Sequence, residues 1–183
     1  MNKAVFLDRD GTIIKDRGYI KDVKDVVFYP SAFDCLKKLQ NHFLLFIVTN
    51  QPGVSKGIIK VTDVEKIHIY ILQKLIEHGI NIKEIYCCTH NKEEQCSCRK
   101  PGTFFIDSAK NKYSIDIESS FIIGDHPSDV QLAIYSKASG IYLLTGHGKK
   151  HYHEINDQVR QTIRICSNLK SATQMILKSI NNQ

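Results

Sequence analysis

The chain has 183 residues, of which 42% are hydrophobic and 24% are charged, a composition typical of a single globular domain. It contains no apolar stretch near the roughly 18 residues that span a bilayer, and its first residues lack the apolar core of a secretory signal. The net charge is +6, but no basic run is interleaved with aromatic residues as in a nucleic-acid groove. We therefore expect one domain over residues 1–183, a cytoplasmic location, no membrane or nucleic-acid partner, and a monomer.

Short apolar runs alternate with amphipathic segments along the chain. Buried strands are predicted at 4–7, 43–48, 82–88, 119–124 and 140–144. Helices are predicted at 31–42, 62–79, 102–113, 127–138 and 167–180. This alternation is typical of an α/β fold, a doubly wound parallel sheet with helices on both faces. The polar stretch 146–161 is interpreted as a surface connection.

Several residues mark the ends of the predicted helices. Ser31 is a candidate N-cap of the first helix. Thr62 and Glu65 have the spacing of a capping box, and Gly79 is a stop signal for the same helix. The apolar stripe of this helix predicts packing on the sheet, and we expect His68 within it to be packed rather than catalytic.

Polar or metal-binding residues follow four of the predicted strands. The segments are DRDGT after the first strand, TNQPG after the second, CTH with CSCRKP after the third, and GDHPSD after the fourth. Ligands of an open parallel sheet bind outside the carboxyl ends of its strands. The four segments therefore predict a site at one edge of the sheet.

Three aspartates, Asp8, Asp10 and Asp125, are expected to converge at this edge. They cannot all remain ionised without a cation, and oxygen ligands favour a hard divalent ion such as Mg²⁺. A carboxylate facing Mg²⁺ can attack phosphorus, so Asp8 at the strand end is the candidate nucleophile. Asp10 would act as acid toward the leaving group and then as base for water. Thr49 and Lys100 are candidates to stabilise charge on the transferring phosphoryl group.

The order of these motifs resembles a known superfamily. DRDGT, TN, a lysine and GDxxxD resemble the four motifs of the haloacid dehalogenase superfamily of Mg²⁺-dependent phosphohydrolases, from Asp8 to about Gly146. In finer detail, FLDRDGTI, VTNQPGVSKG and C-x-H…C-x-C-RKP resemble the D,D-heptose 1,7-bisphosphate phosphatases and their relatives, the histidinol-phosphate phosphatases. The resemblance implies a Rossmann-like fold with a minimal cap and an aspartyl-phosphate intermediate on Asp8.

The resemblance also implies a metal site and a substrate site. Mg²⁺ would be held by Asp8, the backbone carbonyl of Asp10, and Asp125, while Asp129 would support the metal shell or Lys100. The matching substrate-contact positions are Asp16, Arg17, Gly18, Tyr19, Asn50, Gln51, Pro52, Arg99 and His126. Two of these, Pro52 and His126, differ from the residues expected there.

The six cysteines are unevenly spaced, with four of them between positions 87 and 98. Such clustering in a reducing compartment favours a metal site over disulfides. Within the resemblance, Cys88, His90, Cys96 and Cys98 form a Cys₃His set suited to structural Zn²⁺, which would hold the loop that carries Arg99 and Lys100. Cys87 is left over and is interpreted as a small core residue.

Two substrates remain possible, a heptose bisphosphate and histidinol phosphate. The segments GYIKDVKDVVFYP and TNQPGVSKG, with Lys56 able to meet a second phosphate, favour a heptose bisphosphate and the pathway to nucleotide-activated heptose. Against this, only five residues separate His90 from Cys96, a short loop as in histidinol-phosphate phosphatases. A nucleic-acid 3′-phosphatase or a non-catalytic phosphate-binding module is a further alternative of another class.

Overall fold

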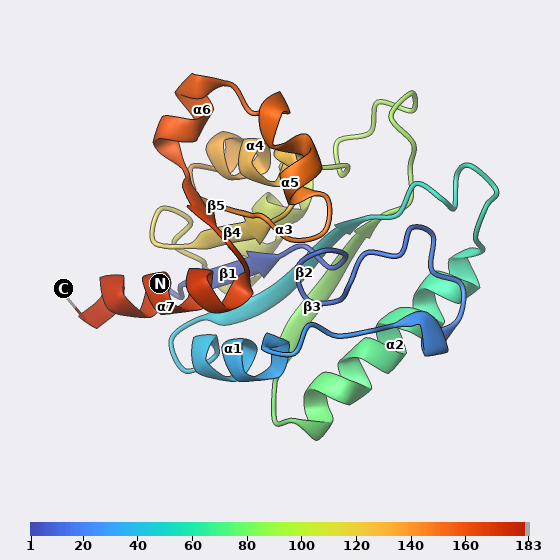
Figure 1. Cartoon of the computed structure of the whole chain (residues 1–183), viewed down its shortest axis with the longest axis horizontal. Coiled ribbons are helices and arrows are strands. Elements are labelled where there is room, and N and C mark those ends of the chain that lie inside the picture. The colour runs from blue at the N-terminus through green and yellow to red at the C-terminus, as the bar shows by residue number, and fades with distance from the viewer. Residues whose placement is uncertain (182–183) are drawn as a thin grey trace.

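The computed structural model describes residues 1–181, and in this range six strands form one sheet. The strands are β1 (Ala4–Leu7), β2 (Leu44–Asn50), β3 (Ile82–Cys88), β4 (Phe121–Gly124), β5 (Ser139–Leu143) and β6 (Arg164–Cys166). Their order is β3-β2-β1-β4-β5-β6, and every neighbouring pair is parallel. This is the order of a doubly wound sheet, so the predicted α/β fold is confirmed (Figure 1).

Helices cover both faces of the sheet (Figure 1). They are α1 (Ala32–Leu39), α2 (Val61–Glu77), α3 (Phe104–Tyr113), α4 (Pro127–Ser136), α5 (Gly148–His151), α6 (Asp157–Thr162) and α7 (Leu169–Asn181), with 3₁₀ turns at Val23–Asp25 and Tyr152–Glu154. One core layer joins α1, α2 and α7 to the sheet, and the other joins α3 and α4 to its opposite face. Within residues 1–181, no helix combines the length and apolarity needed to cross a bilayer.

The strands are buried on both faces because their side chains alternate between the two layers. Val5 and Leu7 of β1 belong to the layer with α1, α2 and α7, whereas Phe6 belongs to the layer with α3 and α4. The Phe6 ring stacks on Phe46 of β2, with centroids 5.0 Å apart. The near-continuous apolar runs in the sequence are the consequence of this double burial.

The region after β5 differs from the prediction. The stretch 146–161, interpreted as a surface connection, contains α5, a 3₁₀ turn and most of α6, and it leads into the unpredicted strand β6. β6 has three residues, of which only Cys166 is buried, so it leaves no apolar run in the sequence. Its backbone nevertheless extends the sheet, pairing Leu143 of β5 with Cys166.

Two predicted helix caps also differ from the structure. α2 begins at Val61, and the backbone N–H of Lys60 donates to Asp63 Oδ2 at 3.0 Å, so Asp63 rather than Thr62 and Glu65 closes this end. Ser31 does precede α1, but its side chain makes no capping hydrogen bond. The predicted stop at Gly79 is confirmed: α2 ends at Glu77, and Gly79 has a φ of +70°, which is easy for glycine.

The order of the strands reverses at β1. β1 pairs with β2 on one side and with β4 on the other, so the strand order reverses there. The backbone N–H of Asp8 donates to the carbonyl of Ile123 at 2.8 Å, which ties the end of β1 to the end of β4. A crevice at the carboxyl end of such a switch point is where open parallel sheets bind ligands.

Candidate active site

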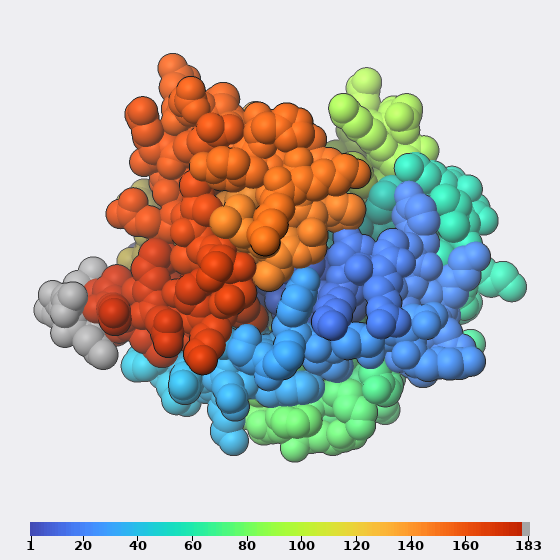
Figure 2. Space-filling view, viewed as in Figure 1, coloured from blue at the N-terminus to red at the C-terminus, as the bar shows by residue number. Residues whose placement is uncertain are grey.

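A cavity of about 710 Å³ lies at the carboxyl ends of the strands. Its floor includes Asp8 after β1, Thr49 of β2 and Asp125 after β4. Figure 2 shows it as a notch between the orange segment near residues 140–155 and the yellow-green loop near residues 90–97, beside the blue segment after β1. The volume lies within the range of small-molecule sites.

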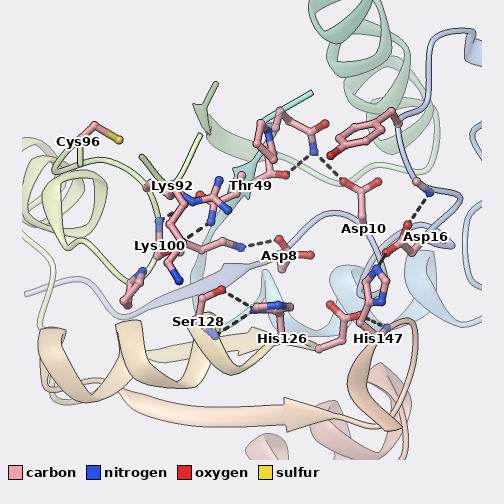
Figure 3. Close-up of a pocket in the computed structure, with 18 of the residues that line it drawn as sticks. Asp8, Asp10, Asp16, Thr49, Lys92, Cys96, Lys100, His126, Ser128 and His147 are labelled. Atoms are coloured by element: carbon pink, nitrogen blue, oxygen red, sulfur yellow. Dashed lines mark hydrogen bonds and ion pairs between the residues drawn. The ribbon is translucent and has the colours of Figure 1, made fainter. Parts of the chain in front are cut away.

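The buried Lys100 contacts two carboxylates, one that lines the cavity and one beneath it. Lys100 Nζ donates to Asp8 Oδ1 at 2.5 Å and to the carbonyl of Val48 at 2.8 Å, and it forms an ion pair with Asp129 Oδ1 at 2.7 Å. Burial alone would lower the pKa of Lys100, but Asp129 and Asp8 raise it, so the ammonium stays charged. The structure thus brings together Asp8 and Lys100, which are 92 positions apart in the sequence (Figure 3).

Asp129 holds this cluster from beneath. It is 1% exposed and does not itself line the cavity. Its Oδ2 accepts the backbone N–H of His126 at 3.0 Å, which caps α4, while Oδ1 faces Lys100. A Cβ on Gly124 would lie 2.1 Å from Asp129 Oδ2, so the carboxylate occupies the space that a side chain at position 124 would need.

Asp8 and Asp125 carry more negative charge than the floor neutralises. Burial, followed by repulsion from Asp129 and Asp10, raises the pKa of Asp8 to about 7 despite Lys100. Burial, followed by repulsion from Asp8 and Asp129, raises the pKa of Asp125 to about 9. Asp8, Asp125 and Asp129 thus lie near a single ammonium, that of Lys100. A bound divalent cation would relieve the repulsion among these carboxylates.

The surroundings of Asp125 fit a hard cation. Its Oδ2 accepts the backbone N–H of His147 at 2.6 Å. Glycines pack against the same oxygen: a Cβ would lie 2.0 Å away on Gly11, whose φ is +81°, and 2.1 Å away on Gly146. Asp8 and Asp125 offer carboxylate oxygens to the cavity, the ligand type that Mg²⁺ takes.

The Asp10 side chain has a partner that the sequence did not suggest. Its Oδ2 accepts two hydrogen bonds from Arg9, from Nε at 3.0 Å and from Nη2 at 2.7 Å, and one from Gln51 Nε2 at 2.8 Å. Arg9 is 1% exposed. The prediction that a metal would be needed to neutralise all three aspartate side chains therefore needs correction, because a buried guanidinium pairs with Asp10.

Residues at the end of β2 form hydrogen bonds with Lys100 and Thr49. Asn50 Oδ1 accepts the backbone N–H of Lys100 at 3.0 Å, and Asn50 Nδ2 donates to the Lys100 carbonyl at 3.3 Å. Gln51 Nε2 also donates to Thr49 Oγ1 at 2.9 Å, and both side chains are buried. Asn50, Gln51 and Pro52 line the cavity, as expected for substrate contacts, but the Asn50 and Gln51 side chains are already engaged with the protein.

The segment after β1 forms one wall. Asp16, Gly18 and Tyr19 line the cavity, and Asp16 Oδ1 accepts the N–H of Gly18 at 2.7 Å. Two further predicted substrate residues lie elsewhere. Arg17 is exposed and is not among the residues of the described chain that line the cavity, and Lys56 lies outside it with Nζ 3.3 Å from the Tyr19 hydroxyl.

The opposite strand end supplies one residue that was expected and two that were missed. His126 lines the cavity, with its Nδ1 accepting the N–H of Ser128 at 3.2 Å. Ser128 and His147 line it as well (Figure 3). His147 links two walls, because its Nε2 lies 2.5 Å from Asp16 Oδ2 while its backbone binds Asp125.

The predicted Cys₃His cluster comes together beyond β3. The ligand atoms of Cys88, His90, Cys96 and Cys98 all lie within 4.8 Å of one another. Cys98 Sγ is 3.3 Å from Cys88 Sγ, 3.3 Å from His90 Nδ1 and 3.5 Å from Cys96 Sγ. Such spacing suits four ligands around a tetrahedral ion with bonds of about 2.0–2.3 Å. The cluster is compatible with Zn²⁺ and uses four protein ligands, as structural sites do.

The other expectations for this region are met in part. Cys87 is half-buried rather than a core residue, and burial raises its thiol pKa to about 11. The loop between the cluster ligands places Lys92 and Gln95, neither of them predicted, along the cavity with Arg99. Arg99 Nη1 donates to the carbonyl of His90 at 3.2 Å, so the cluster and the cationic wall are one unit.

Known proteins resemble the chain in both sequence and structure. A family model described as HAD-hydrolase-like matches residues 97–172. The D-glycero-beta-D-manno-heptose-1,7-bisphosphate 7-phosphatase of Helicobacter pylori strain J99 is 39% identical over 154 residues, which are 83% of this chain and 88% of the relative. The D-glycero-alpha-D-manno-heptose-1,7-bisphosphate 7-phosphatase of Campylobacter jejuni is 38% identical, over 81% of this chain and 85% of the relative.

A solved structure supports the fold. The D,D-heptose 1,7-bisphosphate phosphatase of B. bronchiseptica, complexed with magnesium and phosphate, superposes with a TM-score of 0.87 over 97% of this chain and 99% of that chain, at 24% identity. Identity near 40% over most of the relatives' length shows common descent. The chain belongs to the D-glycero-D-manno-heptose 1,7-bisphosphate 7-phosphatase family of haloacid dehalogenase-like hydrolases.

Proposed function

We propose that the protein is a Mg²⁺-dependent phosphatase that removes the 7-phosphate of D-glycero-D-manno-heptose 1,7-bisphosphate. The observation that carries the substrate is the 39% identity to a relative of that activity over 88% of its length. The cavity supports the reaction, because Asp8, Asp10 and the buried Lys100 all line the same space and Lys100 donates to Asp8.

Asp8 is the proposed nucleophile. One of its oxygens attacks phosphorus, the Asp8 O–P bond forms, and the bond from phosphorus to the substrate's C7 oxygen breaks. Lys100 would stabilise the negative charge that accumulates on the phosphoryl oxygens, because its ammonium already lies against Asp8 in a buried site. Thr49, buried beside Gln51, would add a hydroxyl donor to the same group.

Asp10 is the proposed acid and base. The proton on its carboxyl group passes to the leaving C7 oxygen as the P–O bond breaks, and the carboxylate then takes a proton from the water that attacks the aspartyl-phosphate. Among the described residues, Oδ1 accepts no hydrogen bond. Oδ2 is occupied by Arg9 and Gln51.

Asp8, the backbone carbonyl of Asp10, and Asp125 are proposed to hold Mg²⁺. When bound, the ion would neutralise the carboxylates and the incoming phosphate, so that two anions can approach one another. The magnesium and phosphate in the solved B. bronchiseptica structure support this choice. The glycines against Asp125 support it independently, since they keep side chains away from its Oδ2.

The loop from β3 is proposed to read the second phosphate. Lys92 lies on the side of the cavity away from Asp16 and His147 (Figure 3). Arg99 lines the cavity as well, and its guanidinium offers a planar fork that suits a phosphate. Zn²⁺ in the Cys₃His cluster would fix this loop, because the His90 carbonyl accepts a hydrogen bond from Arg99. A monophosphate such as histidinol phosphate would leave these cations without a partner.

The test is a comparison of kcat/KM on heptose 1,7-bisphosphate, histidinol phosphate and a 3′-phosphorylated oligonucleotide. The proposal requires the heptose bisphosphate to lead by at least about 10-fold, equivalent to about 1.4 kcal/mol of transition-state binding. A lead for histidinol phosphate would instead fit the five residues between His90 and Cys96, the short loop of the alternative. Running both heptose anomers also identifies which one the enzyme prefers.

A further inference from the structure

We propose that Arg9 and His68 are positioning residues, which hold the Asp10 carboxylate in one orientation beside the cavity. The contact chain runs from helix α2 to the cavity: His68 Nε2 lies 3.0 Å from Arg9 Nη1, and Arg9 binds Asp10 Oδ2 through Nε and Nη2. This inference rests on the proposed role of Asp10 as acid and base.

The direction of the hydrogen bonds is fixed by chemistry. A guanidinium has donors only, so His68 must accept through Nε2 and carry its own proton on Nδ1. Burial, and then the charge of Arg9, lower the pKa of His68 to about 3, which keeps the ring a neutral acceptor at physiological pH. His68 is thus a fixed anchor for Arg9 on a helix that packs on the sheet through Ile67 and Ile71.

The arrangement restricts the Asp10 carboxylate to one orientation. Oδ2 accepts three donors, two from Arg9 and one from Gln51. A rotation of the carboxylate would break these contacts and leave the buried Arg9 charge unpaired, which is strongly unfavourable. Oδ1 is left buried and, within residues 1–181, without a hydrogen-bond partner, and Asp10 lines the cavity.

This explains why an arginine is fully buried between two aspartates. Both of its contacts with Asp10 converge on Oδ2, so Arg9 fixes the orientation of the carboxylate that the proposed reaction uses.

The inference predicts that loss of Arg9 or of its anchor impairs proton transfer selectively. The variants are Arg9→Met, His68→Leu, which removes the acceptor, and His68→Gln, which restores one. Lys66→Ala, an exposed change on the same helix, is the matched control. Each is assayed for kcat/KM on 4-nitrophenyl phosphate, whose leaving group needs little protonation, and on an alkyl phosphomonoester.

The alkyl substrate is whichever of heptose 1,7-bisphosphate and histidinol phosphate the wild type prefers, so an error in the proposed substrate does not affect the result. Arg9→Met and His68→Leu should lower the alkyl-to-nitrophenyl ratio about 10-fold or more, within the range of general acid catalysis, and His68→Gln should regain most of it. Asp10→Asn calibrates the ratio.

Two outcomes separate the two proposals. If Asp10→Asn leaves the ratio unchanged, the proposed role of Asp10 is wrong and the inference falls with it. If Asp10→Asn lowers the ratio but Arg9→Met and His68→Leu do not, only the positioning role is wrong. Inhibition by orthovanadate, measured for each variant, confirms that the site is folded; should Arg9→Met fail to fold, the His68 pair decides the question alone.

Discussion

The excess of negative charge around Asp125 predicts how a substitution of this residue affects stability. We expect Asp125→Asn to stabilise the metal-free protein while abolishing its response to Mg²⁺. The pKa of Asp125 is raised from 3.8 to about 9, so at pH 7 the metal-free fold must hold this carboxyl protonated although the unfolded chain would ionise it. The asparagine amide has no such requirement, and its oxygen can still accept the N–H of His147.

The magnitude follows from the size of the shift. Each pH unit between the unfolded and folded pKa costs about 1.4 kcal/mol, so holding the proton at pH 7 costs about 4 kcal/mol at most. Relaxation of the site reduces this, and we expect a gain of about 2–4 kcal/mol, or roughly 5–10 °C in Tm for a chain of this size.

The sign of the pH dependence provides a second check. The folded pKa lies above the unfolded one, so the metal-free wild type binds more protons when folded and loses stability as pH rises from about 4 to about 9. The advantage of Asp125→Asn should therefore grow from about 1–2 kcal/mol at pH 5 to about 2–4 kcal/mol at pH 7, and should continue to grow toward pH 9.

The assay is thermal unfolding in EDTA and in 10 mM Mg²⁺ at pH 5, 7 and 8. Mg²⁺ should raise the Tm of the wild type, most at pH 8, and leave the variant unchanged. A variant less stable than the wild type in EDTA at pH 8, or one that Mg²⁺ still stabilises fully, would show that the carboxylates are not in uncompensated repulsion. Asp25→Asn, at an exposed position, controls for a general charge effect.

Three further outcomes are expected. Asp8→Asn should reduce Mg²⁺-dependent phosphate release by at least about 10³-fold while circular dichroism stays unchanged, and substantial turnover would exclude Asp8 as nucleophile. Metal analysis should find about one zinc per chain, lost in Cys98→Ser, whereas an equal content in both proteins would refute the Cys₃His site. Arg99→Ala should raise KM about 10-fold for the bisphosphate and little for 4-nitrophenyl phosphate, with Lys83→Ala, outside the cavity, as control; equal effects on both substrates would argue against a second-phosphate contact.

Much of the site could be read from the sequence because strand ends are easy to locate. Buried parallel strands leave apolar runs, and the first polar residues after each run mark the sheet edge where ligands bind. Asp8, Thr49 and Asp125 were placed in this way, and the cavity contains all three. The Cys₃His cluster could be predicted for a similar reason, because all four of its residues lie within eleven positions of the sequence.

What the sequence concealed were contacts that depend on tertiary packing. Arginine is usually a surface residue, so the sequence did not predict that Arg9 is buried. Its burial depends on α2, which brings His68 next to it. His147 lies in a polar stretch that offers no periodic signal, yet its backbone reaches Asp125 because the chain turns at Gly146. Gln51 lines the cavity, but the sequence did not indicate that its Nε2 donates to Thr49 and Asp10.

The central claim, hydrolysis at one defined phosphate of a heptose bisphosphate, can be observed directly by ³¹P NMR. Purified enzyme with Mg²⁺ is added to D-glycero-D-manno-heptose 1,7-bisphosphate, and the two ester signals are followed with time beside that of inorganic phosphate. We predict that the 7-phosphate signal disappears, that the 1-phosphate signal persists, and that one equivalent of inorganic phosphate forms. Loss of the 1-phosphate, or two unchanged ester signals under conditions in which histidinol phosphate is hydrolysed, would contradict the account.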